Sequence, residues 1–380
     1  MSKYVYLPQT DIELPLLDKE LIYADISSIV FRSNNGYNIV NNLTAQHNQM
    51  LSFYGAVDSE GVYPRYNPTD YPYKVSPDPE ISVAVKPDPN FKDDFDTLMY
   101  KRSRELASKL TVYDRVYMFW SGGIDSTVIL TAILKNWSVE ELKQLTVVCN
   151  QHSVDEYPNF YQRFVKDKLD TVSSDLFFGD KIKYNHNNIY IASDTGDVVI
   201  GYNFIPYFNQ KFPGLYNKSY KKHSKELIEY FGKNDIGYYA YQRIRRSLDK
   251  NNIEVDTVFD FLWWIDFNWS FDQNLYYFAH MFSLLPEELD TRKFFIDNMF
   301  DWFKVPYFQQ WAFSTIGTSL RIKDDILSFK YAYKKYIYDF DKDLDYFLYK
   351  TRESSIPKND HVHHGRKVLA IDKDWTLYYR

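Results

Sequence analysis

Cysteine is almost absent from this chain. Its 380 residues include a single cysteine, Cys149, so a disulfide framework within the chain and a cysteine-rich zinc site are both excluded. A sulfur-transfer enzyme that works with two cysteines is excluded for the same reason.

Positive charge and long apolar runs are also scarce. The formal net charge is −6. This charge argues against a nucleic-acid partner, because proteins that bind nucleic acids carry a basic footprint. The most apolar stretch, Phe259 to Phe267, is interrupted by Asp260 and Asp266 and is too short to span a membrane. No basic segment followed by an apolar one opens the chain, so no signal peptide is expected. We therefore expect a cytoplasmic protein without a membrane partner.

Length and composition predict two domains with a substantial core. The chain is 45% hydrophobic and 19% aromatic, with 35 tyrosines and 28 phenylalanines. Residues 1–90 are rich in Pro, Asn, Ser and Tyr, with short strand-like pieces at Leu21–Ile29, Gln49–Val57 and Ile81–Val85. We interpret residues 1–90 as a small β-rich or irregular N-terminal domain, and residues 91–380 as a second domain.

The most informative segment is Ser-Gly-Gly-Ile-Asp-Ser-Thr at residues 121–127. It follows an uncharged run at 116–120 and precedes a helix-like apolar stretch. A strand, a small-residue loop and a helix place free backbone N–H groups and a positive helix end against an anion. Gly122 and Gly123 permit the turn and a close backbone approach. The hydroxyls of the three remaining small residues add donors: Ser121, Ser126 and Thr127. An ordinary strand-to-helix turn is the alternative.

Asp125 is unexpected in a phosphate loop unless Mg²⁺ lies between the carboxylate and the phosphates. The segment is also not the Gly-x-x-x-x-Gly-Lys-Ser/Thr loop of kinases and GTPases, so that fold is disfavoured.

Strands and helices alternate beyond residue 93. Helical spacing follows Asp93 and Asp94, which are placed to cap the helix. Strands are expected at 116–120, 145–149 and 188–192, with a helix starting near Asp155-Glu156. The alternation predicts an α/β fold, a parallel sheet with helices on both faces. From about residue 219 the chain reads as mostly helical.

A second small-residue loop, residues 193–203, contains Asp197. Loops at the carboxyl ends of neighbouring parallel strands face one crevice. Asp125 and Asp197 are then candidate ligands of one Mg²⁺, with ATP oxygens completing its shell. An Asx-turn that closes a surface loop is the alternative for this segment.

The 121–126 segment resembles the pyrophosphate loop of the ATP-pyrophosphatase superfamily. The resemblance implies an adenine nucleotide alpha hydrolase-like fold that splits ATP between the α- and β-phosphates. Residues 193–203 further resemble a stretch of the synthetase domain of asparagine synthetases and β-lactam synthetases. Asp194 and Asp197 fall on the two acids of that stretch, and Gly201 falls on a closing glycine. Val198 stands in place of the usual Glu, a departure that bears on the acceptor chemistry more than on the adenylation.

Three further positions follow from this resemblance, which covers roughly residues 93–380. Cys149 ends the strand whose backbone contacts adenine in the family, and the cysteine itself is expected to be a packing residue. Gln309 stands where the family has Asp. Lys350 matches a lysine that reaches the departing pyrophosphate, with an exposed solvated lysine as the alternative.

The resemblance implies an ATP- and Mg²⁺-dependent synthetase. A substrate carboxylate would be adenylated and then captured by ammonia or an amine, giving an amide. The chain begins Met-Ser-Lys-Tyr and lacks the N-terminal cysteine of the glutaminase domain. A nucleotide-binding module without turnover and a nucleobase- or tRNA-modifying adenylating enzyme are the alternatives. Self-association is left open.

Three histidines near the C-terminus form one more candidate cluster: His361, His363 and His364. No carboxylate or cysteine cluster frames them in the sequence, so a surface tail is favoured over a metal site.

Overall fold

The computed structural model describes the chain in segments. They are residues 19–24, 28–33, 36–41, 85–174, 185–193, 195–201, 204–231, 235–267, 294, 297–350, 369–371 and 377–379. The chain divides into two compact units, one made of residues 1–84, 207–281 and 358–380 and the other of residues 85–206 and 282–357. Residues 207–281 and 358–380, which lie within the expected domain 91–380, belong to the first unit by this division.

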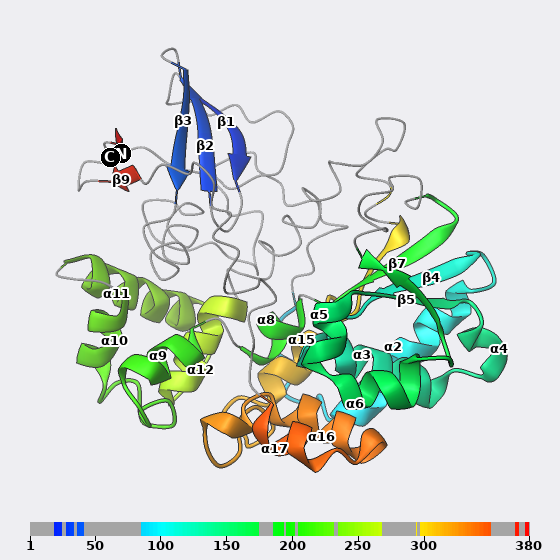
Figure 1. The fold of residues 1–380 in the computed structure, drawn as a ribbon. Coiled ribbons are helices and arrows are strands. Elements are labelled where there is room, and N and C mark those ends of the chain that lie inside the picture. The colour runs from blue at the N-terminus through cyan, green and yellow to red at the C-terminus, as the bar shows by residue number, and fades with distance from the viewer. Residues whose placement is uncertain are drawn as a thin grey trace. The chain divides into compact units, whose positions relative to one another are not determined.

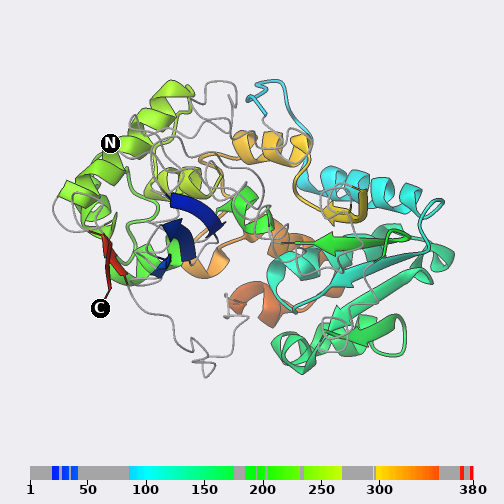
Figure 2. The same cartoon turned by 90° about the horizontal axis from the view of Figure 1, so that it is seen from above.

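A parallel sheet of five strands forms the centre of the second unit, in the order β6-β5-β4-β7-β8 (Figures 1 and 2). The strands are β4 Arg115–Phe119, β5 Leu145–Cys149, β6 Asp170–Ser173, β7 Asn188–Ala192 and β8 Met299–Asp301. Together with its helices, the sheet agrees with the predicted α/β class.

The strands predicted at 116–120, 145–149 and 188–192 are confirmed, with the first shifted by one residue. All five residues of β5 are buried, and buried and half-buried residues alternate along β4. Central parallel strands are covered on both faces and therefore read as continuous apolar runs. The edge strands β6 and β8 were not predicted, because each is short and carries polar residues.

Side chains from α2 and from the turn before β8 hold this last strand in place. Buried Arg102 donates from Nε to the carbonyl of Trp302 at 3.0 Å and from Nη2 to that of Asp301 at 2.7 Å. Asn298 donates to the carbonyl of Asn188 at 2.7 Å. These bonds satisfy one carbonyl at the end of β8, one just after it and one at the start of β7.

Helices connect the strands of this sheet. Those of the second unit are α2 Phe95–Lys109, α3 Ile124–Asn136, α4 Val139–Leu142, α5 Gln151–Glu156, α6 Pro158–Phe160, the π-helix η2 Tyr161–Val165, α8 Thr195–Ile200, α15 Pro306–Ser314, the 3₁₀-helix η5 Ile326–Ser328, α16 Tyr331–Asp341 and α17 Leu344–Tyr349. As predicted, Asp94 caps α2, accepting from Thr97 N at 2.8 Å. The helix expected to start near Asp155 instead ends there, because Asn150 and Ser153 form a capping box that starts α5 earlier.

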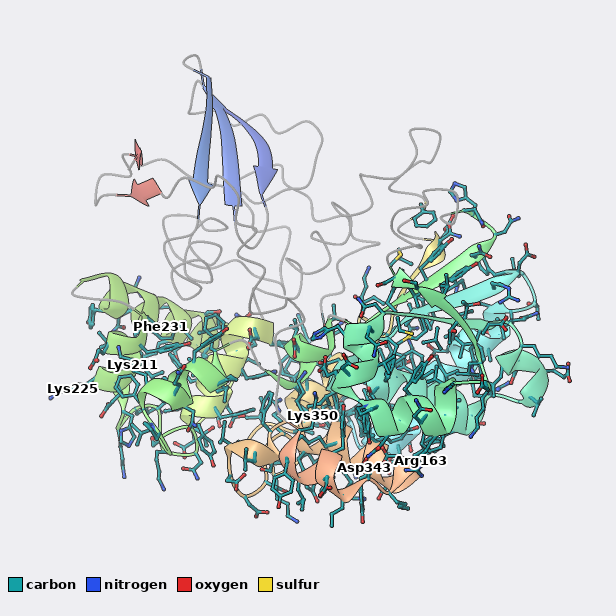
Figure 3. The ribbon with its side chains drawn as sticks, viewed as in Figure 1. Arg163, Lys211, Lys225, Phe231, Asp343 and Lys350 are labelled. Atoms are coloured by element: carbon teal, nitrogen blue, oxygen red, sulfur yellow. The ribbon has the colours of Figure 1, made fainter. Side chains whose placement is uncertain are left out.

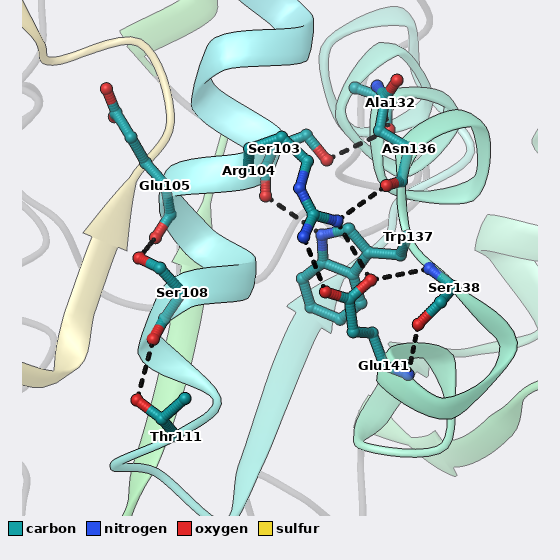
Figure 4. A network of polar contacts seen from close by, with 10 residues as sticks. All are labelled: Ser103, Arg104, Glu105, Ser108, Thr111, Ala132, Asn136, Trp137, Ser138 and Glu141. Atoms are coloured by element: carbon teal, nitrogen blue, oxygen red, sulfur yellow. Dashed lines mark hydrogen bonds and ion pairs between the residues drawn. The ribbon is translucent and has the colours of Figure 1, made fainter.

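A polar network joins α2 to the segment that leads from α3 into α4 (Figure 4). Arg104 donates to both carboxylate oxygens of Glu141, at 2.9 and 3.0 Å. Glu141 also accepts from Ser138 N and closes the capping box of α4. The Trp137 indole donates to the Ser103 carbonyl at 3.1 Å. The network thus fixes the connection between α3 and α4 against α2.

Part of the aromatic excess fills the core of this unit. Phe95 stacks on Tyr333 and packs against Phe308, Trp311 and Tyr336. All five are buried. Aromatic rings supply large buried areas per residue, so we assign these aromatic residues to packing.

The first unit contains two small antiparallel sheets and a helical part. Its strands are β1 Lys19–Ala24, β2 Ser28–Ser33 and β3 Gly36–Asn41 in one sheet, and β9 Leu369–Ile371 and β10 Leu377–Tyr379 in the other. Its helices are α10 Ser224–Phe231, α11 Asp235–Lys250 and α12 Val258–Ile265, while α9 Ile205–Lys211 runs from the second unit into it. The predicted strand Leu21–Ile29 is replaced by β1 and β2. Gln49–Val57 and most of Ile81–Val85 lie outside the described residues.

The most apolar stretch of the sequence is α12, whose residues are all buried. Its N-cap is Thr257, whose hydroxyl accepts from Asp260 N at 3.0 Å. None of the helices in the described part of the chain is long and apolar enough to cross a membrane.

Candidate functional site

The site predicted from the sequence lies where the strand order changes direction. From β4 the chain adds β5 and β6 on one side, whereas β7 and β8 lie on the other. In open α/β sheets, ligands bind outside the carboxyl ends of the strands at such a switch point. The loops after β4 and β7 are the two loops that flank it, and they lead into α3 and α8.

The loop after β4 has the backbone geometry of an anion site. Gly122 has a φ of +80°, in the left-handed region. A Cβ at this position would lie 2.3 Å from the carbonyl oxygen of Ser153, so the loop packs directly against α5. Gly123 is the N-cap of α3 and offers no side chain to cap it. The first N–H groups of a 13-residue helix are therefore left without a side-chain cap.

The loop hydroxyls mainly shape the loop itself. Ser121 Oγ accepts from Gly123 N at 3.2 Å and lies 3.0 Å from Ser126 Oγ. Ser126 Oγ accepts from Ser121 N at 3.1 Å. Thr127 is fully buried, and its Oγ1 accepts from the Trp120 indole at 3.0 Å. The structure thus places Thr127 behind the loop, where it supports the loop from the protein interior.

Asp125 and Asp197 lie close together, because both carboxylates form ion pairs with the ammonium of Lys330. Asp125 is in the first turn of α3 and Asp197 is in the first turn of α8. From the sequence we expected these acids to face one crevice and to share one Mg²⁺. The structure brings them together on a cation that belongs to the chain.

Lys330 was missed by the sequence reasoning. It lies four residues before the pair Lys334-Lys335, and no motif surrounds it. Its side chain is 5% exposed. Its backbone is left-handed, with φ 59° and ψ 36°, at the residue before α16. A lysine in this conformation is strained, so tertiary contacts must hold it there.

The charge of Lys330 is maintained by the two acids. Burial by itself lowers the pKa of a lysine, but Asp125 and Asp197 outweigh that effect and raise the pKa of Lys330 above its usual range. The group is therefore an ammonium at neutral pH. Lys330 neutralises part of the negative charge that the two carboxylates bring to the switch point.

The two acids have the donor chemistry of a Mg²⁺ site. Gly196 leaves the space that Asp125 needs: a Cβ there would lie 2.7 Å from Asp125 Oδ1. Among the described residues, no group of three or more His, Cys, Asp and Glu side chains converges. The two acids thus fit a divalent cation that takes its other ligands from a nucleotide. Binding of such a cation stays a prediction.

Lys350 lies beside the loop after β4. It follows α17 (Figure 3), and its ammonium pairs with Glu156 at 3.1 Å. The two side chains are 8% and 5% exposed, so the solvated-lysine alternative does not hold. A Cβ on Gly123 would lie 3.3 Å from Glu156 Oε1, which places this pair next to the loop backbone.

Tyr346 of α17 also contacts this loop. Its hydroxyl donates to the carbonyl of Gly122 at 3.4 Å and lies within hydrogen-bonding reach of Thr127. Burial raises the pKa of Tyr346 well above its usual value, so the group is a neutral donor. Sequence reasoning missed this residue, because one tyrosine among 35 gives no signal.

The other predicted positions are packing residues in this structure. Cys149 is buried at the end of β5, and burial raises the pKa of its thiol. Val198 is fully buried. Gln309 is fully buried and donates to the carbonyl of Lys304 at 2.9 Å. The adenine-contacting role expected for the backbone at Cys149 stays a prediction. Asp194 and the three C-terminal histidines lie outside the described residues.

Comparison with known proteins adds no family assignment. No protein-family model matches the sequence, and no curated protein matches it.

Proposed function

We propose that the chain is an ATP-dependent synthetase with an adenine nucleotide alpha hydrolase-like fold. It would adenylate a small-molecule carboxylate, release pyrophosphate, and form an amide with ammonia or an amine. One observation carries the proposal: Asp125 and Asp197, from the first turns of α3 and α8 beside the switch point, converge at an N-terminus of α3 that no side chain caps. Carboxylates next to an anion-binding helix end are the combination that a metal-bound polyphosphate requires.

In the proposed reaction, a carboxylate oxygen of the substrate attacks the α-phosphorus of ATP and the bond to the β-phosphate oxygen breaks. The amine nitrogen then attacks the acyl carbon, loses a proton, and displaces AMP. The N–H groups at the start of α3 would bind phosphate oxygens, and Asp125 and Asp197 would hold Mg²⁺. When bound, Mg²⁺ offsets the charge that grows on the departing pyrophosphate.

Lys350 is assigned to the pyrophosphate side of the site. Its ammonium already lies beside the loop backbone, held by Glu156. A lysine next to the departing group stabilises the charge that develops in the transition state more than the charge of bound ATP. Lys350 should therefore affect turnover more than nucleotide affinity.

The test is pyrophosphate release from ATP with a panel of amino acids, other carboxylates and amines. We expect AMP and pyrophosphate as products. Asp197→Asn should slow release by about ten- to a thousandfold, the range seen when one electrostatic partner is removed. Asp170→Asn is the matched control, because Asp170 is exposed on β6 and pairs with Arg115 at 2.8 Å, away from the switch point.

ADP and orthophosphate as products would contradict the proposal. ATP binding without release by the wild type, over the whole panel, would favour a nucleotide-binding module without turnover. Release that required tRNA or a nucleobase in place of the carboxylate would favour the modifying enzyme.

A further inference from the structure

Lys330 lies where the proposed function requires a metal ion. Its ammonium pairs with Asp125 and Asp197 together, and these are the two carboxylates assigned to Mg²⁺. The side chain is 5% exposed, and the two acid side chains are 20% and 22% exposed. The acids are thus reached from solvent, whereas the lysine reaches them from the protein interior.

The backbone keeps the lysine in this place. Tyr331 N donates to the carbonyl of Arg321 at 3.1 Å, and Ala332 N donates to that of Leu320 at 2.8 Å. These bonds fix the start of α16 and hold Lys330 in its left-handed conformation. Relaxing the strain at Lys330 would mean breaking them.

We propose that Lys330 is an internal cation that makes metal binding at Asp125 and Asp197 depend on nucleotide. A divalent ion that arrives alone must replace the ammonium between the two carboxylates, or share them with it. Either course is unfavourable, because two cations would compete for two acids at short range in a partly buried site. A metal ion that arrives bound to a polyphosphate comes with the negative charge of the phosphates, and this charge offsets the charge of Lys330. Metal and nucleotide therefore enter together.

The inference rests on the proposed function, since it concerns the metal that would accompany ATP. It can nevertheless be tested separately from that function, because it predicts the affinity of the protein for a divalent ion in the absence of any nucleotide. Lys334 provides a matched control. It is a buried lysine one turn further along the same segment, and its ammonium donates to the carbonyl of Leu327 at 2.6 Å.

The experiment measures Mn²⁺ binding to the full chain by electron paramagnetic resonance, with and without α,β-methylene-ATP. We expect the wild type to bind Mn²⁺ alone weakly and to gain affinity with the nucleotide. Lys330→Met should bind Mn²⁺ alone about tenfold more tightly than the wild type, or better, because a competing cation is removed. Lys334→Met should stay close to the wild type. Adding Asp197→Asn to Lys330→Met should abolish the gain.

The inference is overturned if Lys330→Met binds Mn²⁺ alone no more tightly than the wild type, or if the gain survives Asp197→Asn. Lys330→Gln, whose amide can still donate to the acids, replaces the methionine variant if that variant does not fold. If neither variant folds, wild-type affinity for Mn²⁺ that is the same with and without the nucleotide overturns the inference. Failure of the wild type to bind ATP at all would instead remove the proposed function, and the measurements with Mn²⁺ alone would still decide the role of Lys330.

Discussion

The ring of Tyr346 lies flat on that of Tyr157, with ring centroids 3.7 Å apart and planes 9° apart. Tyr157 directly follows Glu156, the partner of Lys350, and its hydroxyl donates to the carboxylate of Asp341. The stack therefore joins the end of α5 to α17. Because Tyr346 also reaches the carbonyl of Gly122, the geometry of the proposed phosphate loop depends on a helix more than 200 residues away in sequence.

Tyr346→Phe should weaken nucleotide binding while the stack remains. The change removes only the hydroxyl that reaches Gly122, and a hydrogen bond of this kind contributes about 0.5–1.5 kcal/mol. We expect a loss of about two- to tenfold in ATP affinity by calorimetry. Tyr349→Phe is the control, since Tyr349 is 65% exposed. Equal affinity in the wild type and both variants would show that the hydroxyl does not support the loop.

Gly122→Ala should destabilise the fold more than Gly317→Ala. Both glycines have positive φ, +80° and +70°. A Cβ on Gly317 meets nothing within 4 Å, so that variant measures conformational strain alone, about 1–2 kcal/mol. A Cβ on Gly122 meets the carbonyl of Ser153 at 2.3 Å, which adds a steric cost. Urea unfolding of the two variants measures the difference, and equal losses would contradict the packing of the loop against α5.

A bulky residue at Gly122 is for the same reason no clean probe of phosphate binding. Its side chain would meet α5 of the protein before it met a ligand, so lost ATP binding would report a damaged loop.

Lys350→Met should lower both stability and turnover. Removing one partner of a buried ion pair leaves Glu156 as an unpaired buried carboxylate, at a cost of about 3–5 kcal/mol. The double variant Lys350→Met with Glu156→Gln should recover most of this stability, because no unpaired charge remains. Turnover should not recover, since the cation beside the loop is still absent. Recovery of pyrophosphate release in the double variant would assign Lys350 a structural role only.

Lys334 should make stability rise with pH in the alkaline range. Burial, followed by the charges of Lys350 and Lys330, lowers the pKa of Lys334 to about 8. In the unfolded chain the pKa is near 10.5, so between these values the unfolded state binds more protons. The free energy of unfolding should therefore increase from about pH 8 upward, by about 3 kcal/mol at most.

Lys334→Met removes this titration and supplies the reference. The wild type should be less stable than the variant at pH 7, and the difference should narrow as the pH rises to 9.5. Chemical unfolding of both proteins at several pH values measures this difference in the free energy of unfolding. A difference that stays constant with pH would show that Lys334 titrates normally.

The sequence predicted the strands that are most buried. β5 reads as an unbroken apolar run because both its faces are covered. The strands β6 and β8 were missed, because they lie at the sheet edges and are stabilised by neighbours. For β8 these neighbours include Arg102, 199 residues away in sequence. Local patterns carry no information about such contacts.

The same distinction holds for the candidate site. Asp125 and Asp197 were found because each follows a strand with small residues around it, and strand ends of a parallel sheet meet at one edge. Lys330 lies just before α16 and Tyr346 lies in α17, and both were missed because the local pattern of these segments shows only packing. Their positions depend on how α16 and α17 fold back on the loop after β4. The spacing of residues along the chain does not reveal this folding.

The cations of the site come last in the chain. Asp125, Glu156 and Asp197 are all made before Lys330, which pairs with an acid 205 residues earlier, and before Lys350. Domains form as the chain leaves the ribosome, N-terminal parts first. A growing chain that has reached residue 325 already contains the three carboxylates but neither lysine that pairs with them. The ion pairs of the candidate site can therefore close only after residue 350 has been made, so a shorter growing chain cannot hold the proposed site in its formed state.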